Sequence, residues 1–507
     1  MDTVKLQPAR VLRLLLAVVL LVGVAARYSA AQQPQSQNQS PNQNQNQKQD
    51  QAQPDSSAPS AQASSTEKPE VKITPREAEE LFHSVDEIMT FDSQQTGIAI
   101  KKQVKRRLTS RNEVEAYLTK HMKDEDVKRL QRSELVLKKF GLLPRDFDLE
   151  KLLVELLREQ IAGYYDPKTK TVNLLDWVPV EEQEPVLAHE LTHALQDQYI
   201  GLDKWMRRGE RDLGEMKKDP TPADIEDDEM DDTREAVVEG QAEMVMLQYE
   251  LVPVGRSILD SPDLVDSMES QMASGTDDSK VFKDAPIFLR ESLTFPYSYG
   301  LKFEVKLLQS GGKQKAFADV LTNPPHTTRE IMQPETYLAG EQIPAMPVVD
   351  FKRDFKDYTK FDIGAMGEFD VAVLAEQYAG KKASERVYPA WRGGYYYAAR
   401  PKDDKTAPLG LFYVSRWSDA EKASEFAGLY AESLAKRYTK LQETGKSAPA
   451  DATPHHSKYK IELLQGRHAW NTEEGPVIIE QKGDTVLVCE SLNAATTATL
   501  EKEVFQK

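Results

Sequence analysis

Apolar residues recur at helical spacing in three segments of the N-terminal half of the chain. Residues 74–91 (TPREAEELFHSVDEIMTF) begin with Thr74 and Pro75, a capping residue followed by a first-turn proline, and carry apolar side chains three and four positions apart. The same spacing recurs in residues 113–122 (EVEAYLTKHM) and 148–163 (DLEKLLVELLREQIAG). The pattern therefore predicts a helix in each of the three segments.

A basic cluster lies within this predicted helical region. Its members are Lys101, Lys102, Lys105, Arg106, Arg107 and Arg111. We expect these side chains to cover the solvated face of a helix, which is the usual setting of a charge run. Binding of an anionic partner is the alternative.

Residues 163–176 (GYYDPKTKTVNLLD) follow a strand pattern instead. Aromatic and β-branched residues flank the turn sequence Asp166-Pro167-Lys168-Thr169, which predicts a β-hairpin. Such a hairpin either packs as an ordinary part of the core or offers an edge strand to which an extended peptide can add. The sequence leaves both interpretations open.

The pattern changes again after residue 350, where strands and helices alternate. It predicts a helix at 368–380, strands at 391–401 and 409–417, an amphipathic helix at 418–438, a hairpin at 476–490 and a last helix. We therefore expect residues 350–507 to form an α+β domain with a mostly antiparallel sheet. Its aromatic residues, Trp391, Trp417 and Tyr395 to Tyr397, are expected in the sheet core rather than in a carbohydrate or peptide site. His455 and His456 are expected on a surface loop.

The N-terminus has the pattern of a signal peptide. Lys5, Arg10 and Arg13 precede an apolar run at 14–26, and small residues follow up to Ala31. The run is too short to cross a bilayer comfortably, and no other segment is long and apolar enough, so we expect no stable membrane insertion after cleavage. Residues 1–31 are thus predicted to be removed, which leaves a secreted or periplasmic protein.

Composition refines this picture in two ways. Residues 32–69 are rich in Gln, Asn, Ser and Pro and predict a disordered tether, so that the first folded domain spans residues 70–349. The net charge of −17 argues against nucleic acid as a partner, because counterion release rewards basic surfaces. The single cysteine, Cys489, excludes an internal disulfide.

Residues 182–200 (EQEPVLAHELTHALQDQYI) carry the clearest chemical signal. On the predicted helix, His189 and His193 lie four positions apart on one face, so their imidazoles can converge on one ion. Glu190 is offset by about 100° around the axis, where it can reach a water molecule rather than the ion. The motif predicts one Zn²⁺ per chain, with Glu190 as the catalytic base.

A third ligand is expected on the helix predicted at 234–248 (REAVVEGQAEMVMLQ). Its stripe of acids contains Glu235, Glu239 and Glu243. The apolar setting of Glu239 indicates burial, and a buried carboxylate requires a charge partner such as a metal ion; a solvated acidic face is the alternative. Gly240 would let this helix approach the histidine helix closely. Glu243, or else Asp197, would then accept a hydrogen bond from a ligand histidine and fix its orientation.

The motifs together resemble those of a known family. HELTH followed by a helical glutamate is similar to the gluzincin zinc metallopeptidases. More closely, HELTHALQDQ, VEGQA, FPYSYGLKFE and NPPHTTREIMQPETYLAGE resemble, in order, the HExTHALQDQ, EGxA, FPYxxG and PPxST motifs of a group of largely uncharacterised secreted bacterial proteins.

This resemblance covers about residues 163–341. It implies a zincin-like domain, mostly helical with a small hairpin, in which His189, His193 and Glu239 bind zinc and Glu190 is the base. It also implies that Tyr297 stabilises the oxyanion, although a buried aromatic could equally be a core residue.

Two features depart from the family pattern. A charged insertion at 201–232 separates His193 from Glu239, and its ADIEDDEMDD stretch is expected to be a mobile, solvated flap rather than a calcium site, because it matches no calcium loop. Arg329 and Gln333 stand where relatives often have glutamate and histidine, which puts a catalytic role for these positions in doubt. His326, in the loop after Pro324-Pro325, is a candidate to line the substrate cleft; an ordinary loop histidine is the alternative.

The sequence therefore predicts an exported zinc metallopeptidase that hydrolyses peptide bonds of a peptide or protein substrate. Three alternatives stay open: a zinc hydrolase that acts on other bonds, a zinc-bound inactive interaction module, and a protein that cleaves only itself or one dedicated partner. An intact Glu190 favours activity, because a purely structural zinc site does not require it.

Overall fold

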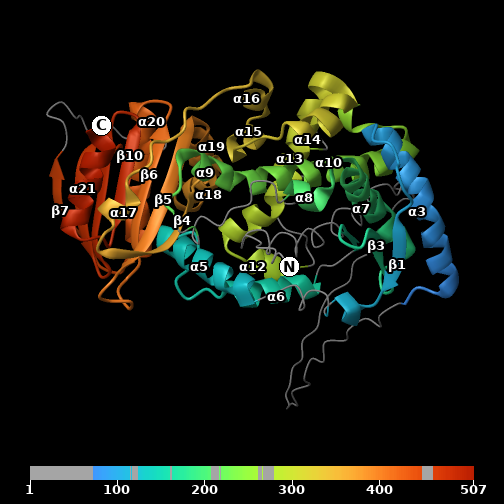
Figure 1. Ribbon diagram of the computed structural model, residues 1–507, viewed down its shortest axis with the longest axis horizontal. Coiled ribbons are helices and arrows are strands. Elements are labelled where there is room, and N and C mark those ends of the chain that lie inside the picture. The colour runs from blue at the N-terminus through green and yellow to red at the C-terminus, as the bar shows by residue number, and fades with distance from the viewer. Residues whose placement is uncertain are drawn as a thin grey trace, which may run out of the picture.

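The computed structural model describes residues 72–114, 116, 124–159, 163–206, 216, 218–260, 265, 279–447 and 461–506. The predicted signal peptide and tether, most of the helix predicted at 113–122, and the pair His455-His456 lie outside these residues. Within them, no helix combines the length and the apolar run needed to cross a bilayer. The class is α+β, as predicted, with a long helical part and a seven-stranded sheet at opposite ends of the molecule (Figure 1).

The helical part precedes residue 350. Its helices are α3 (Pro75–Thr96), α5 (Asp124–Phe140), α6 (Leu149–Glu159), α7 (Val180–Ile200), α8 (Leu202–Met206), α9 (Pro222–Glu226), α10 (Met230–Leu251), α12 (Lys280–Asp284), α13 (Ile287–Gln314), α14 (Val320–Thr322), α15 (Thr328–Met332) and α16 (Pro334–Ala339). Short 3-10 turns are η2 (Asp227–Glu229), η3 (Val252–Val254) and η4 (Ile258–Asp260), and η5 (Lys315–Asp319) is a π-helical turn. The strands of this helical part are β1 (Lys105–Thr109), β2 (Tyr164–Asp166) and β3 (Thr171–Leu175).

The remaining elements follow residue 350. The helices are α17 (Phe351–Asp354), α18 (Glu368–Ala379), α19 (Lys381–Val387), η6 (Tyr388–Ala390), α20 (Ala420–Arg437) and α21 (Ala494–Phe505). The strands are β4 (Tyr358–Ala365), β5 (Trp391–Pro401), β6 (Gly410–Trp417), β7 (Leu441–Ser447), β8 (Gly466–Thr472), β9 (Gly475–Lys482) and β10 (Thr485–Glu490).

The first predicted helix is confirmed as α3, and its ends follow from its caps. The Thr74 side chain accepts from the Glu77 backbone N–H while the Glu77 carboxylate accepts from the Thr74 backbone N–H, a reciprocal capping box. Gly97 ends the helix in a left-handed conformation (φ 76°). The apolar face of α3 packs on α7, so this helix supports the one that carries the histidines.

The small sheet has the order β1-β3-β2 and corrects one expectation. The predicted hairpin is confirmed, because β2 and β3 pair antiparallel around the turn at 167–170. The basic cluster, however, does not form the face of one helix: of its members only Arg111 is helical, and residues 105–109 form β1, which pairs in parallel with β3 from Lys105↔Thr171 to Thr109↔Leu175. The ladder hydrogen bonds come from a strand more than 60 residues away, and local periodicity carries no sign of such a partner.

The helix predicted at 234–248 is confirmed as part of α10, but Gly240 serves a different contact from the expected one. A Cβ at Gly240 would lie 2.3 Å from the carbonyl carbon of Gly300 on α13, and one at Gly300 would lie 2.2 Å from the Ala236 oxygen. The two glycines thus let α10 and α13 cross almost backbone to backbone. The close approach that Gly240 permits is therefore with α13, not with the histidine helix.

The acidic stretch at 223–232 is not a solvated flap. It forms α9, η2 and the first turn of α10. The buried Glu229 carboxylate accepts from both the backbone N–H (2.9 Å) and the hydroxyl (2.7 Å) of Thr328, and Asp228 accepts from the Ala365 N–H at 2.9 Å. These donors lie about 100 or more residues later in the chain, so sequence charge alone predicted exposure incorrectly.

The seven strands after residue 350 form one antiparallel sheet in the order β4-β5-β6-β10-β9-β8-β7. The predicted strands at 391–401 and 409–417 are confirmed as β5 and β6, and the predicted hairpin as β9 and β10. Neighbouring residues of β6 face opposite sides: Phe412 meets Phe355, whereas Tyr413 meets Phe426 of α20. Four of the aromatic residues predicted in the sheet core are buried: Trp391, Trp417, Tyr395 and Tyr397. The fifth, Tyr396, is partly buried.

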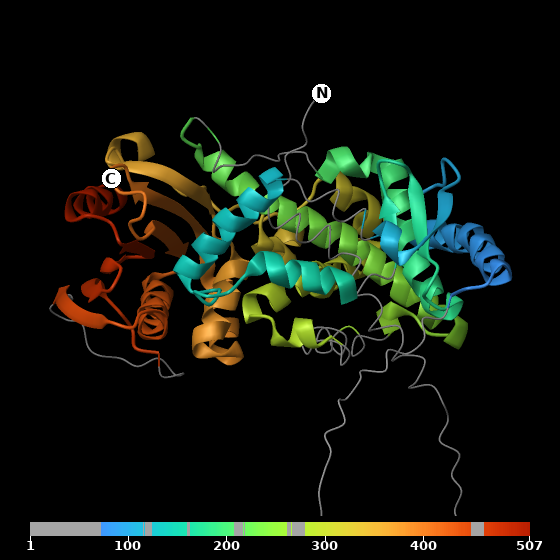
Figure 2. The same cartoon turned by 90° about the horizontal axis from the view of Figure 1, so that it is seen from below.

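One helix joins the two ends of the molecule. Figure 2 shows the turquoise α5 beside the orange sheet, and α6 continuing from it across the green helices. Phe140 at the end of α5 makes edge-to-face contacts with Tyr396 and Tyr413 of the sheet, at ring-centroid distances of 5.6 Å each. A continuous cluster of buried apolar residues therefore runs through both parts. The predicted domain boundary at 349/350 stays a prediction.

Candidate metal centre

Helices α7 and α10 bring together the three predicted zinc ligands. The Nε2 atom of His189 lies 3.0 Å from Oε2 of Glu239, and Nε2 of His193 lies 3.4 Å from the same oxygen. One ligand atom from each of the three residues lies within 4.8 Å of the others, and all three side chains are buried. This is the one group of three or more metal-ligating side chains found among the described residues.

The spacing of these atoms fits a zinc ion. Zn²⁺ binds nitrogen and oxygen at about 2.0–2.1 Å, so two ligand atoms of a tetrahedral site lie roughly 3.3 Å apart. The distances from the two histidine nitrogens to Oε2 of Glu239, 3.0 and 3.4 Å, bracket that value. Two imidazoles and a carboxylate are also a donor set that zinc prefers and that leaves one coordination position for a water molecule.

His193 is oriented by Gln196, a residue that sequence reasoning missed. Nδ1 of His193 lies 2.8 Å from Oε1 of Gln196. The amide nitrogen of Gln196 donates to the Val238 carbonyl and to Oε1 of Gln241, both at 2.9 Å. Because that nitrogen is committed to acceptors, Oε1 is the acceptor toward His193, which places the ring proton on Nδ1 and the lone pair of Nε2 toward Glu239.

Glu243 lies near the other histidine, but the hydrogen bond predicted between them is not formed. Its Oε2 is 3.7 Å from Nδ1 of His189, and neither Nδ1 nor the two Glu243 oxygens has a hydrogen-bond partner among the described residues. Asp197, the alternative, makes no hydrogen bond or ion pair with a ligand histidine in the described part of the chain. Its carboxylate accepts instead from the Tyr165 hydroxyl (2.7 Å), the Lys170 ammonium (2.6 Å) and the Leu202 N–H (3.1 Å).

The cluster is strongly coupled electrostatically. Burial by itself lowers the pKa of the His189 imidazole, but Glu239 and Glu243 reverse the effect and raise it to about 10. Burial by itself raises the pKa of Glu239, but the neighbouring His193 and His189 lower it to about 2. The carboxylate is thus held in its ionised, ligating form, and a metal ion competes with the ring protons for the same nitrogen atoms.

Glu190 and Tyr297 flank the three ligands. Glu190 is only 4% exposed, and its Oε2 accepts from the backbone N–H of Tyr165 in the edge strand β2 at 2.6 Å. Burial raises its pKa. The ring of Tyr297, on α13, stacks on that of His189 at 6.2 Å between centroids, and its hydroxyl has no hydrogen-bond partner among the described residues. Burial and the charge of Glu239 keep the pKa of this hydroxyl well above 10, so it stays a donor.

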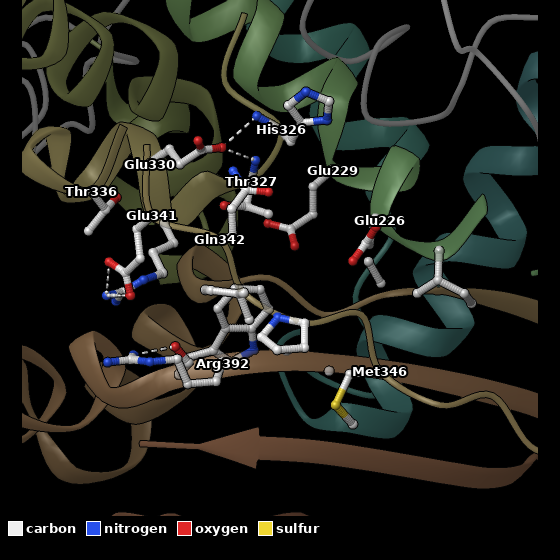
Figure 3. Close-up of a pocket in the computed structure, with 18 of the residues that line it drawn as sticks. Glu226, Glu229, His326, Thr327, Glu330, Thr336, Glu341, Gln342, Met346 and Arg392 are labelled. Atoms are coloured by element: carbon white, nitrogen blue, oxygen red, sulfur yellow. Dashed lines mark hydrogen bonds and ion pairs between the residues drawn. The ribbon is translucent and has the colours of Figure 1, made fainter. Parts of the chain in front are cut away.

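His326 lies in a different place from the predicted cleft. It lines a cavity of about 300 Å³ between η2, the loop before α15 and the start of β5, and neither the predicted ligands nor Glu190 line this cavity. Figure 3 shows His326 at its rim, where the Glu330 carboxylate accepts from the backbone nitrogens of His326 and Thr327. The expectation that His326 lines the same cleft as the metal centre is therefore not met.

Arg329 and Gln333 hold a buried carboxylate rather than face the metal centre. Arg329 donates to Glu368 at 3.1 Å, and the Gln333 amide donates to both Glu368 oxygens at 2.7 Å. Burial raises the pKa of Glu368 to about 7 despite these donors. The two positions that depart from the family pattern thus join α15 to α18.

Nothing matched this chain when it was compared with protein-family models, with curated proteins and with solved structures. The resemblance to gluzincins therefore rests on the motifs themselves, and the zincin-like fold stays a prediction.

Proposed function

We propose that this chain is an exported zinc-dependent metallopeptidase of gluzincin type. The observation that carries the proposal is the convergence of one atom each from His189, His193 and Glu239 within 4.8 Å in a buried setting, with a further carboxylate, Glu190, beside them. Histidine and glutamate side chains are rarely buried together without a shared cation or ion pair to compensate the charge.

The residues divide the chemistry of hydrolysis between them. A bound zinc ion would supply a Lewis acid and lower the pKa of a water molecule toward neutrality. Glu190 takes the proton of the attacking water and passes it to the leaving amine. The Tyr297 hydroxyl, a donor without a partner among the described residues, donates a hydrogen bond to the oxyanion that develops on the substrate carbonyl.

The low exposure of the site favours a restricted form of this activity. The side chains of His189, His193 and Glu239 are 0%, 11% and 8% exposed, so a folded protein surface has little access to them. An extended segment of one dedicated partner, or of the chain itself, fits this setting better than a broad range of substrates. A zinc-bound inactive module is the remaining competitor.

Zinc content and peptide cleavage, measured on the same preparations, test the proposal. We expect one zinc per chain in the wild type and in Glu190→Gln, with cleavage of an unbiased peptide library lost only in the variant, by about 10²–10⁴-fold. Glu184→Gln, the same change six residues earlier on α7, is the matched control and keeps activity. Absence of zinc from the wild type refutes the proposal.

Two further outcomes separate the alternatives. Zinc in both proteins with cleavage by neither supports the inactive module or a dedicated partner. Cleavage of ester or other acyl substrates but not of peptides supports a non-peptidase hydrolase. Export is tested separately by N-terminal sequencing of the protein recovered from the producing cells, with Gln32 expected as the first residue.

A further inference from the structure

One tyrosine of the edge strand contacts two carboxylates of the histidine helix. Glu190 and Asp197 are seven residues apart on α7, so they share one side of the helix and are separated by about 10 Å along its axis. Tyr165 spans this distance. Its backbone N–H donates to Glu190 Oε2 at 2.6 Å, and its hydroxyl donates to Asp197 Oδ2 at 2.7 Å.

Asp197 binds the turn of the same hairpin as well. The Lys170 ammonium lies 2.8 and 2.6 Å from the two Asp197 oxygens, and the Asp197 side chain is only 1% exposed. Lys170 has a left-handed backbone (φ 58°), which a non-glycine residue adopts only where the surroundings compensate. The ion pair with a buried carboxylate is such a compensation. Asp197 therefore ties both β2 and the turn to α7.

We propose that Asp197 is a positioning residue for the base Glu190 and acts through Tyr165; the inference rests on the proposed function. The hydrogen bond from the Tyr165 amide fixes one oxygen of Glu190 and its rotamer. The described residues place no hydrogen bond on the other oxygen, Oε1, which is left to take the proton from water. A backbone donor cannot move independently of its strand, so the Tyr165 hydroxyl and Asp197 set where that donor lies.

Tyr165→Phe, Asp197→Asn and the double variant test this inference. Small misplacements of a catalytic group cost up to about 10²-fold in rate. We expect kcat to fall about 10-fold in Tyr165→Phe and 10- to 100-fold in Asp197→Asn, with KM within about twofold and one zinc per chain retained. If Asp197 acts through Tyr165, the double variant falls no further than Asp197→Asn alone.

Tyr164→Phe is the matched control. It removes one phenolic hydroxyl from the same strand, at a side chain that packs with Val114, Leu175 and Val178 instead. We expect wild-type kcat from it. Hydrogen exchange gives a readout besides activity: amides of residues 163–176 in the metal-free protein should exchange about 10-fold faster in Asp197→Asn and unchanged in Tyr164→Phe.

Three results overturn the inference. The first is wild-type kcat and exchange in both single variants. The second is faster exchange with unchanged kcat in zinc-loaded protein, which makes the contacts purely structural. The third is a wild type that binds zinc but cleaves neither the peptide library nor its own chain; the inference then fails together with the general peptidase activity on which it rests. In the first two, wild-type activity is intact, so the proposed function survives.

Discussion

Two buried glutamates, at opposite ends of the molecule, are compensated in different ways. Glu239 on α10 faces two imidazoles, and Glu490 on β10 faces an arginine, a lysine and two tyrosines. The pKa of each carboxyl group is lowered even though burial by itself raises it. Both are therefore ionised side chains held inside the protein by their neighbours.

The neighbours of Glu490 supply permanent charge. Arg437 donates to it at 2.7 Å, the Tyr430 hydroxyl donates at 2.7 Å, and the Tyr438 hydroxyl donates to the second oxygen. Lys139 from α5 lies 3.8 Å away. An arginine does not lose its charge at any physiological pH, so this cluster is complete without a ligand and fixes α5 against the sheet.

The neighbours of Glu239 are of another kind. A metal ion can displace the protons of imidazoles and bind the lone pairs that are left, which it cannot do with an arginine. Tyr297 and Glu243 keep polar atoms without hydrogen-bond partners near the same histidines. A buried carboxylate surrounded by arginine and tyrosine thus has a structural role, whereas one surrounded by histidines is suited to bind a cation.

The largest effect is expected from removing the carboxylate of Glu239. Glu239→Gln should lower zinc affinity by at least about 10³-fold, or roughly 4 kcal/mol, because a neutral amide is a poor zinc ligand. Competition with a fluorescent chelator measures the change. Glu235→Gln, one turn earlier on α10, is the control and should retain zinc. Full zinc occupancy in Glu239→Gln would show that the third ligand is another residue.

Removing the compensating charge at the other cluster should affect stability instead. Arg437→Met leaves Glu490 buried without its main partner, which should lower the free energy of unfolding by about 3–5 kcal/mol. Urea unfolding measures this, and the folded protein should still bind one zinc. The exposed neighbour substitution Lys436→Met should change stability by less than about 0.5 kcal/mol. A loss of zinc from folded Arg437→Met would contradict the separation of the two clusters.

A smaller effect is expected from the amide behind His193. Gln196→Leu removes the acceptor that fixes the ring, so zinc affinity should fall about 10- to 100-fold. Gln198→Leu, two residues later, is the control, since that amide accepts from the backbone of Lys101 and Lys102 on the outside of the helix. Equal affinities of the two variants would mean that Gln196 does not orient His193.

The smallest effect concerns a third buried carboxylate, Glu229, which accepts from a hydroxyl and an N–H but forms no ion pair with any described residue. Burial raises its pKa to about 8. A raised acid pKa stabilises the folded state below the unfolded pKa of about 4.5, and this contribution is lost as pH rises through 8. Between pH 6 and 7.5, wild type should lose about 1–2 kcal/mol relative to Glu229→Gln, as measured by urea unfolding at each pH. Parallel stability curves would contradict this.

The candidate site was predictable from sequence where its geometry is local. His189 and His193 converge because both lie on α7 four residues apart, and the burial of Glu239 follows from the apolar pattern around it. Gln196 gave a weaker signal, because a glutamine three residues after a histidine is typical of an ordinary solvated helix surface. Only the positions of Val238 and Gln241 on another helix show that it is an acceptor.

The same distinction holds for the fold. The N-terminal cap of α3, the hairpin at 163–176 and the strands β5, β6, β9 and β10 were predicted because turn residues and periodicity specify them locally. Strand β1 was not, because its hydrogen-bond partner lies more than 60 residues away. The burial of Asp228 and Glu229 depended on donors from Ala365 and Thr328.

The sequence by itself determined which side chains can perform chemistry here: two histidines one helical turn apart, a glutamate beside them and a buried acid on a second helix. The tertiary structure alone decided which groups support them. It placed Gln196 rather than Asp197 behind His193, joined Asp197 to Tyr165, and set Gly240 against α13. The physical reason is that periodicity encodes contacts within a helix or hairpin, whereas partners of buried polar groups are chosen by packing between segments far apart in the chain.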